Sequence, residues 1–149
     1  LLGTYEQELH PVIARLIEGR FDAVVDVGCA EGYYLAGVAH ACRRRGLPVP
    51  RLTGYDTNPD AIALAAELVR LNDLGQWVAV HQAWFTGQGL EAGRVALICD
   101  IEGDEENLLN PETLPALRRV ELLVEVHDAP GTSRRLDLLQ ERFRATHEI

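Results

Sequence analysis

Apolar residues follow two spacings along this chain, and the two spacings alternate. Short continuous apolar runs, typical of strands buried on both faces, are separated by segments in which apolar residues recur three and four positions apart, as on one face of a helix. Strands are predicted over 23–27, 51–55, 77–81, 95–99 and 120–126, with the start of a sixth over 146–149. Helices are predicted within 1–20 and over 35–45, 59–71, 105–109, 111–117 and 133–144.

This alternation indicates the fold class. Helices that connect successive strands form β-α-β crossovers, which produce a mostly parallel sheet covered on both faces. We therefore predict a single α/β domain over 1–149, a three-layer sandwich with an N-terminal helix within 1–20 and a core over 21–149. In such sheets ligands bind beyond the carboxyl ends of the strands, so the residues that follow each strand are the functional candidates.

Turn and cap residues set the expected helix boundaries. The first helix has two interpretations: Thr4 and Gln7 have the spacing of a capping box, whereas Pro11 suits the first turn of a helix that begins later. Gly46 predicts the end of the second helix, and Asn58 followed by Pro59 predicts the start of the third.

The composition narrows the class of protein. The chain has 149 residues, 23 of them acidic against 14 basic, and its formal net charge of −9 disfavours binding to nucleic-acid phosphates. Every basic residue is Arg, so Schiff-base and P-loop chemistry, which need Lys, are excluded. Three widely spaced cysteines argue against a disulfide framework or a zinc site. We see no signal peptide and no apolar run of membrane-spanning length, and we expect a cytoplasmic protein without a membrane partner.

The turn after the first strand reads Asp-Val-Gly-Cys-Ala-Glu-Gly-Tyr over 26–33. Its small residues allow a ligand to approach the backbone closely, and the next helix offers free N–H groups to an anionic group. In the dinucleotide-binding fingerprint Gly-x-Gly-x-x-Gly/Ala, the three small residues would fall at the positions of Gly28, Ala30 and Tyr33. Ala30 replaces the middle glycine and Tyr33 replaces the last small residue, which argues against NAD.

The same turn resembles motif I of class I S-adenosylmethionine-dependent methyltransferases, which has the pattern acid-x-Gly-x-Gly-x-Gly. Asp26, Gly28 and Gly32 match this pattern, and Ala30 replaces its central glycine. The resemblance implies a Rossmann-like fold with strand order 3-2-1-4-5 and a terminal pair of strands, sixth and seventh, that is incomplete in this chain. It also implies S-adenosylmethionine as the cofactor, with its methionine part over this turn. The turn residues expected to bind the cofactor are Asp26, Gly28, Cys29, Ala30, Gly32 and Tyr33.

Polar residues also follow the second and third strands. A carboxylate at Asp56 can accept hydrogen bonds from both ribose hydroxyls, and the resemblance places an acidic residue there, with Thr57 beside it. Asn58 serves as the helix cap, which leaves Asp56 for the ligand. Gln82 and Ala83 stand where the family often has an acid and Ala near the adenine, and the Gln82 carbonyl can accept from an amino group.

Acidic residues are concentrated after the fourth strand. Asp104 and Glu105 suit a solvated helix start, where acids interact favourably with the helix dipole. Asp100 and Glu102 lie at the strand end, and Asp100 is expected to contact the cofactor as well. The stretch Asp-Ile-Glu-Gly-x-Glu, followed by a strand reading Leu-Val-Glu-Val-His, resembles the FkbM-type methyltransferases, a subfamily associated with O-methylation of sugars and other small molecules.

Methyl transfer from a sulfonium needs alignment of the reactants, and a base when the acceptor is a hydroxyl. Asp100, Glu102, His127 and Asp128 are the available bases, and we expect His127, with Asp100 and Glu102, to act in catalysis because a neutral imidazole suits neutral pH. Asp100, Glu102, Glu125 and Asp128 also offer oxygen ligands to a divalent ion, although we expect no metal. Glu125 and His127 should point to the same face of their strand.

These observations favour an S-adenosylmethionine-dependent methyltransferase that acts by O-methylation on a small-molecule acceptor. Two other classes stay open. A non-catalytic domain of the same fold, which binds a partner, predicts weak or absent cofactor binding, and an NAD-dependent oxidoreductase predicts binding of NAD. The sequence leaves a homo-oligomer open.

Overall fold

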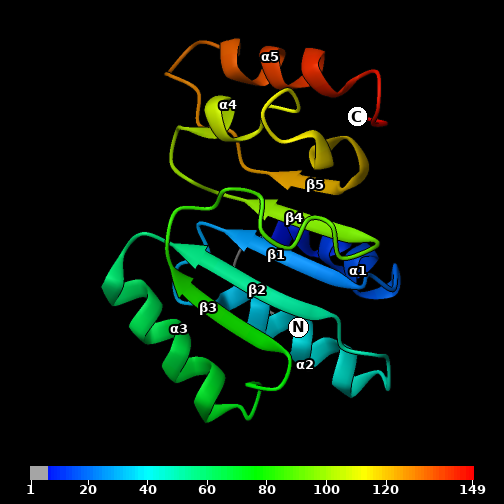
Figure 1. Ribbon diagram of the computed structural model, residues 1–149, viewed down its shortest axis with the longest axis vertical. Helices are drawn as coiled ribbons and strands as arrows, with labels where there is room; N and C mark the ends of the chain where they lie inside the picture. Colours follow the sequence, from blue (N-terminus) through cyan, green and yellow to red (C-terminus); the bar gives the residue numbers. More distant parts are fainter. Residues whose placement is uncertain (1–6) are drawn as a thin grey trace.

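The computed structural model describes residues 7–149 and contains one five-stranded sheet among them. Its strands are β1 (Ala23–Val27), β2 (Arg51–Asp56), β3 (Val78–Gln82), β4 (Val95–Cys99) and β5 (Glu121–Val124). All neighbours are parallel and the order is β3-β2-β1-β4-β5, which confirms the expected topology (Figure 1). In this order β2 and β3 lie on one side of β1, and β4 and β5 lie on its other side. The carboxyl ends of β1 and β4 therefore form the switch point at which such sheets bind ligands.

Helices cover both faces of the sheet, as the sandwich requires. One face packs against α1 (His10–Glu18), α2 (Tyr33–Arg44) and α3 (Pro59–Leu71), with a short 3₁₀ turn η1 (Gln7–Leu9) before α1. The other face packs against α4 (Glu105–Leu108), the 3₁₀ segment η2 (Pro115–Arg119) and α5 (Arg134–Phe143). No helix of the described part of the chain combines the length and apolarity needed to cross a bilayer.

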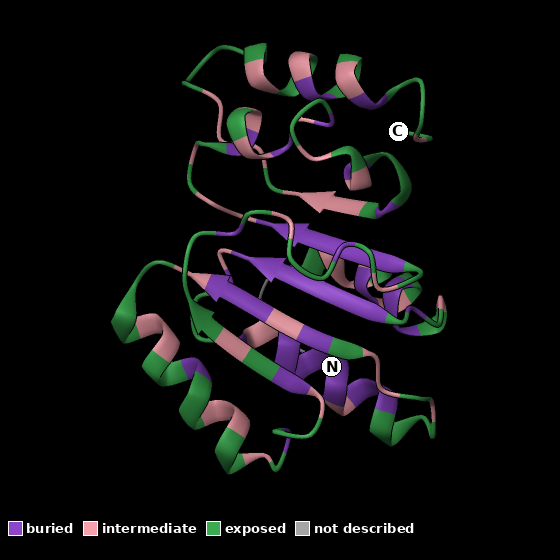
Figure 2. Cartoon of the chain, in the orientation of Figure 1, coloured by how far each residue is buried: buried purple, intermediate pink, exposed green. Residues whose placement is uncertain are grey.

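The two central strands are the most deeply buried part of the protein. Every residue of β1 and β4 is buried, whereas β3 and β5 at the sheet edges are partly exposed (Figure 2). Successive residues of β1 pack on opposite faces, so Val24 joins one core and Val25 the other. Asp26 is the single charged residue within β1, and it is 2% exposed.

Several predicted helix boundaries are confirmed. The Asn58 side chain accepts a hydrogen bond from the backbone N–H of Asp60 at 3.0 Å and caps α3, with Pro59 in its first turn. Gly46 follows α2 with a φ of 65°. Pro11 lies in the first turn of α1, whose N-cap Leu9 makes no side-chain cap bond. The alternative cap at Thr4 lies outside the described residues.

The predicted helix over 111–117 is wrong. The Asn110 side chain accepts from the backbone N–H of Glu112 at 3.0 Å, which forms a turn in place of a helical start. Pro115 has no N–H to donate, and the chain continues as the 3₁₀ segment η2.

The ends of two predicted strands also differ from the structure. No strand forms over 146–149, because Thr146 and His147 donate their backbone N–H groups to the Phe143 carbonyl and extend the turn after α5. β5 ends at Val124, two residues before the predicted end. The Glu125 N–H still donates to the Cys99 carbonyl at 3.0 Å, but the regular pairing with β4 ends at Val124.

Candidate functional site

The turn between β1 and α2 is held against the end of β4. The Gly28 N–H donates to the Tyr55 carbonyl at 2.8 Å, and its φ is 80°. A Cβ atom at this position would lie 1.6 Å from the Asp100 carbonyl oxygen. Only glycine fits this close approach of two backbones, which agrees with its place in the glycine-rich pattern.

Asp56 connects this turn to the end of β2. One carboxylate oxygen accepts the Ala30 N–H at 3.0 Å, and the other accepts the Asn58 N–H at 2.8 Å. Ala30 has a φ of 44°, a conformation that non-glycine residues seldom adopt outside constrained loops. Each carboxylate oxygen keeps a further acceptor position, so Asp56 remains able to bind a ligand hydroxyl.

A cavity of about 450 Å³ opens beside these loops, a size within the range of small-molecule and cofactor sites. The sequence predicted half of its lining: Gly28, Ala30, Asp56, Thr57, Ala83, Asp100 and Glu102. The other half, which it missed, is mostly apolar: Val27, Tyr55, Trp84, Phe85, Ile101, Asp104 and Leu108. The available signal in the sequence was the aromatic pair that follows Ala83, directly after the predicted third strand. In the structure Trp84 is 76% exposed and lines the cavity.

Other predicted cofactor residues do not line this cavity. The Cys29 side chain is buried in the core beside α2, and burial, followed by the charges of Asp26 and Asp56, raises the pKa of its thiol to about 12. Gly32 is the N-cap of α2, and the Tyr33 ring packs edge-on against Tyr34. Gln82 is exposed at the end of β3.

Asp26 lies beneath the turn. It is 2% exposed, and its Oδ2 atom has no hydrogen-bond partner. Burial, followed by the nearby charges of Asp100 and Asp56, raises the pKa of this carboxyl from 3.8 to about 7. An acid with an unmatched buried oxygen is suited to a cationic group, which would restore its ionised form.

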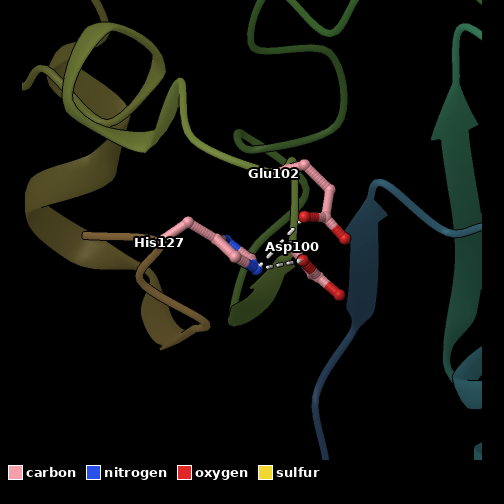
Figure 3. A group of neighbouring side chains, drawn as sticks. All are labelled: Asp100, Glu102 and His127. Carbon is pink, nitrogen blue, oxygen red and sulfur yellow. Dashed lines mark ion pairs between the residues drawn. The ribbon is translucent and has the colours of Figure 1, made fainter. Parts of the chain in front are cut away.

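A second group of polar side chains gathers where β4 and β5 end. His127 Nδ1 lies 2.9 Å from Glu105 Oε1, and His127 Nε2 lies 3.7 Å from Asp100 Oδ1 and 3.5 Å from Glu102 Oε2 (Figure 3). Glu125 Oε1 is 3.7 Å from the same Nε2 atom, so these two side chains lie together, although both follow the end of β5 and do not share a strand face as predicted. Two segments that are distant in the sequence therefore meet at one imidazole.

Glu105 holds this group together and is the clearest departure from expectation. It is fully buried, where the sequence predicted a solvated acid at a helix start. Its Oε1 atom accepts from the Gly103 N–H at 2.9 Å as well as facing His127, and its Oε2 atom lies 3.6 Å from Arg135 Nε. Burial raises the pKa of Glu105, but the hydrogen bonds from His127 and from backbone N–H groups outweigh burial, and the net pKa is below its usual value.

His127 is held in a strongly acidic environment. The hydrogen bond to Glu105 raises its pKa, partial burial lowers it, and the carboxylates of Glu102 and Asp100 raise it, so the net pKa is above the ordinary value for histidine. Asp128, which the sequence offered as a base or a metal ligand, has a structural role in this fold. Its two carboxylate oxygens accept the backbone N–H groups of Arg135 and Leu136 at 2.8 and 3.0 Å, so it caps the start of α5.

The fold is shared with solved methyltransferases. A precorrin-6y C5,15-methyltransferase from Geobacter metallireducens GS-15 is 14% identical with a TM-score of 0.63, and the match covers 93% of this chain and 72% of that one. A putative O-methyltransferase from Klebsiella pneumoniae is 16% identical with a TM-score of 0.60, covering 97% and 70%. An RNA methyltransferase from Salinibacter ruber, in complex with S-adenosyl-L-homocysteine, is 16% identical with a TM-score of 0.55, covering 83% and 80%.

Sequence comparison adds nothing further: no protein-family model and no curated protein sequence matches this chain. At identities of this size, the structural matches establish the fold alone. The chain has the Rossmann-like α/β fold of these methyltransferases, and its function has to be argued from its own site.

Proposed function

We propose that this protein is an S-adenosylmethionine-dependent methyltransferase that methylates a hydroxyl group of a small molecule. The observation that carries the proposal is the cavity at the switch point of the sheet, in which the Asp56 carboxylate and the close-packed turn at Gly28 share one wall. The resemblance of this turn to motif I of class I methyltransferases implies that both features would contact this cofactor. The S-adenosyl-L-homocysteine bound to the Salinibacter ruber enzyme supports the same choice of ligand.

The residues on this wall fit the cofactor's chemistry. Asp56 has acceptor positions for two ribose hydroxyls, and the apolar side chains of Phe85 and Ile101 provide a surface for a planar base. Asp26 does not line the cavity but lies buried beneath the adjoining turn, where its unpartnered oxygen suits an ammonium group. We call Gly28, Ala30, Asp56 and Thr57 the cofactor rim of the cavity.

The loop after β4 carries the groups that act on the acceptor. Asp100 and Glu102 line the cavity, and both lie beside His127; we call these three residues the acceptor rim. The bound cofactor supplies a methyl group already activated on a positively charged sulfur. The protein then has to hold the acceptor hydroxyl in line, through hydrogen bonds to the carboxylates, and His127 Nε2 accepts its proton when no cation is bound there.

The finer assignment is to the FkbM-like methyltransferases. The Asp-Ile-Glu-Gly-Asp-Glu stretch and the Leu-Val-Glu-Val-His stretch, which carry that resemblance, meet in the contact between Glu105 and His127. A small hydroxylated acceptor, such as a sugar, is the substrate class that this resemblance favours.

Asp56→Ala tests the cofactor rim directly. We expect its affinity for S-adenosylhomocysteine, measured by calorimetric titration, to fall at least about tenfold, because hydrogen bonds to a charged group each contribute roughly 1.5–3 kcal/mol. Asp60→Ala is the control: it removes the same charge from an exposed position four residues further on. Equal affinity for the two variants would sink the ribose assignment, and a thermal melt of each variant separates lost binding from lost folding.

A further inference from the structure

We propose that the acceptor rim is a binding site for a divalent transition-metal cation, with Asp100, Glu102 and His127 as its protein ligands. One carboxylate oxygen from each acid and the imidazole nitrogen all lie within 4.8 Å of one another. The three side chains come from two different loops and converge on one point (Figure 3). The metal site stands on these residues alone, and only its use in catalysis rests on the proposed function.

Two of the separations between these atoms are only a few tenths of an ångström longer than those around a metal ion. Two ligand atoms each about 2.1 Å from an ion are roughly 3.0 Å apart at a right angle and roughly 3.4 Å apart at a tetrahedral angle. His127 Nε2 lies 3.5 Å from Glu102 Oε2 and 3.7 Å from Asp100 Oδ1, longer than ordinary hydrogen bonds between these groups. The gap is therefore wider than direct contact needs, and close to the spacing that a shared ion imposes.

The orientation of the imidazole is an independent indication. Glu105 is fully buried and faces Nδ1 at 2.9 Å, so the Nδ1–H donates to it and the Nε2 atom points at Asp100 and Glu102. A carboxylate that fixes the second nitrogen of a histidine is the usual support of a metal-ligating imidazole. When the imidazole is neutral, Nε2 and the two carboxylate oxygens are three electron-rich atoms that face one another, and a cation that takes the place of the Nε2 proton would stabilise this arrangement.

The ligand set indicates the kind of ion. One imidazole with two carboxylates suits a first-row divalent ion such as Mn²⁺ or Zn²⁺ better than Ca²⁺, which prefers oxygen ligands alone. Three protein ligands also leave positions open. Because Asp100 and Glu102 line the cavity, an ion held here would present those positions to an oxygen atom of the acceptor.

The site is tested by titrating Mn²⁺ into the full chain, after treatment with a chelator, and following the loss of the free-ion paramagnetic resonance signal. We expect saturable binding of one ion per chain, weakened at least about tenfold in Glu102→Gln. Glu102 has an 84% exposed side chain, so this variant keeps the fold. Glu112→Gln, at an exposed position elsewhere, makes the same change in net charge and should bind like the parent.

His127→Gln is the second variant, with His40→Gln as its control because His40 contacts Asn72 on another part of the surface. We expect weaker Mn²⁺ binding in His127→Gln and unchanged Mn²⁺ binding in His40→Gln. Absence of saturable binding, or binding by Glu102→Gln that equals that of the parent, overturns the proposal. Titration of the chelator-treated chain with S-adenosylhomocysteine reports on the cofactor rim separately, so failure of the metal site and failure of the methyltransferase proposal give different results.

Discussion

The two rims of the cavity are built on different principles. The cofactor rim depends on backbone conformation: Gly28 and Ala30 have left-handed φ values, and the Asp56 carboxylate binds backbone N–H groups. The acceptor rim depends on ionisable side chains, supported by the buried Glu105 and its half-buried partner Arg135. Substitutions that change shape should therefore damage the first rim most, and substitutions that change charge should damage the second.

The largest effect is expected for Gly28→Ala on the cofactor rim. Its Cβ atom would overlap the Asp100 carbonyl, so we expect a loss of roughly 3 kcal/mol or more in the free energy of unfolding, measured with urea. Gly131→Ala is the matched control, since Gly131 also has a φ of 80° but no atom lies within 4 Å of the place its Cβ would take. That variant should lose about 1 kcal/mol, the cost of the left-handed conformation alone. Similar losses in both would show that the contact with β4 does not restrict the turn.

The next effect concerns the support of the acceptor rim. Glu105→Ala removes the partner of His127 Nδ1 and of the Gly103 N–H, and leaves the largely buried Arg135 with the more distant Glu106 carboxylate as its remaining ion-pair partner. We expect a loss of about 2–3 kcal/mol in unfolding free energy. In Glu106→Ala, the main ion pair that is lost joins Glu106 to the exposed Arg134, and the loss should stay below about 1 kcal/mol. Equal losses from the two neighbouring positions would contradict the role of Glu105.

A smaller, pH-dependent effect is expected for Asp26→Asn. The native pKa of Asp26 is about 7 against 3.8 for the ordinary group, so the folded protein holds a proton that the unfolded chain releases. Wild-type stability is therefore fully present near pH 4 and decreases as the pH rises to about 7. Asn cannot ionise, so the variant should gain stability relative to the wild type as the pH rises through this window. Unfolding curves for the two proteins that stay parallel between pH 4 and pH 8 would show that Asp26 is not neutral in the native state.

The cofactor rim could be predicted from the sequence and the acceptor rim only in part, for a physical reason. The turn at Gly28 and the acid at Asp56 are local features, since glycine spacing and strand ends are visible in a short stretch of sequence. The same holds for the strands, whose continuous apolar runs reproduce β1 and β4 residue for residue.

Glu105 shows where local reading fails. An acid in the first turn of a helix is normally solvated, and nothing near it in the sequence reveals that His127 and Arg135 will enclose it. The helix predicted over 111–117 failed for a related reason, since its apolar spacing was helical but Asn110 and Pro115 favour turns. Contacts between distant segments decide the first case, and competing turn chemistry decides the second.

The proposed function depends most on the binding of S-adenosylmethionine in the cavity at the ends of β1 and β2. Calorimetric titration of the full chain with S-adenosylhomocysteine, with NAD as the comparison ligand, measures this binding without any knowledge of the acceptor. We predict one site per chain with micromolar affinity for S-adenosylhomocysteine and no binding of NAD. Binding of NAD, or no binding of either ligand, would contradict the proposal: the first result would indicate an oxidoreductase, and the second a domain that keeps the methyltransferase fold without the cofactor.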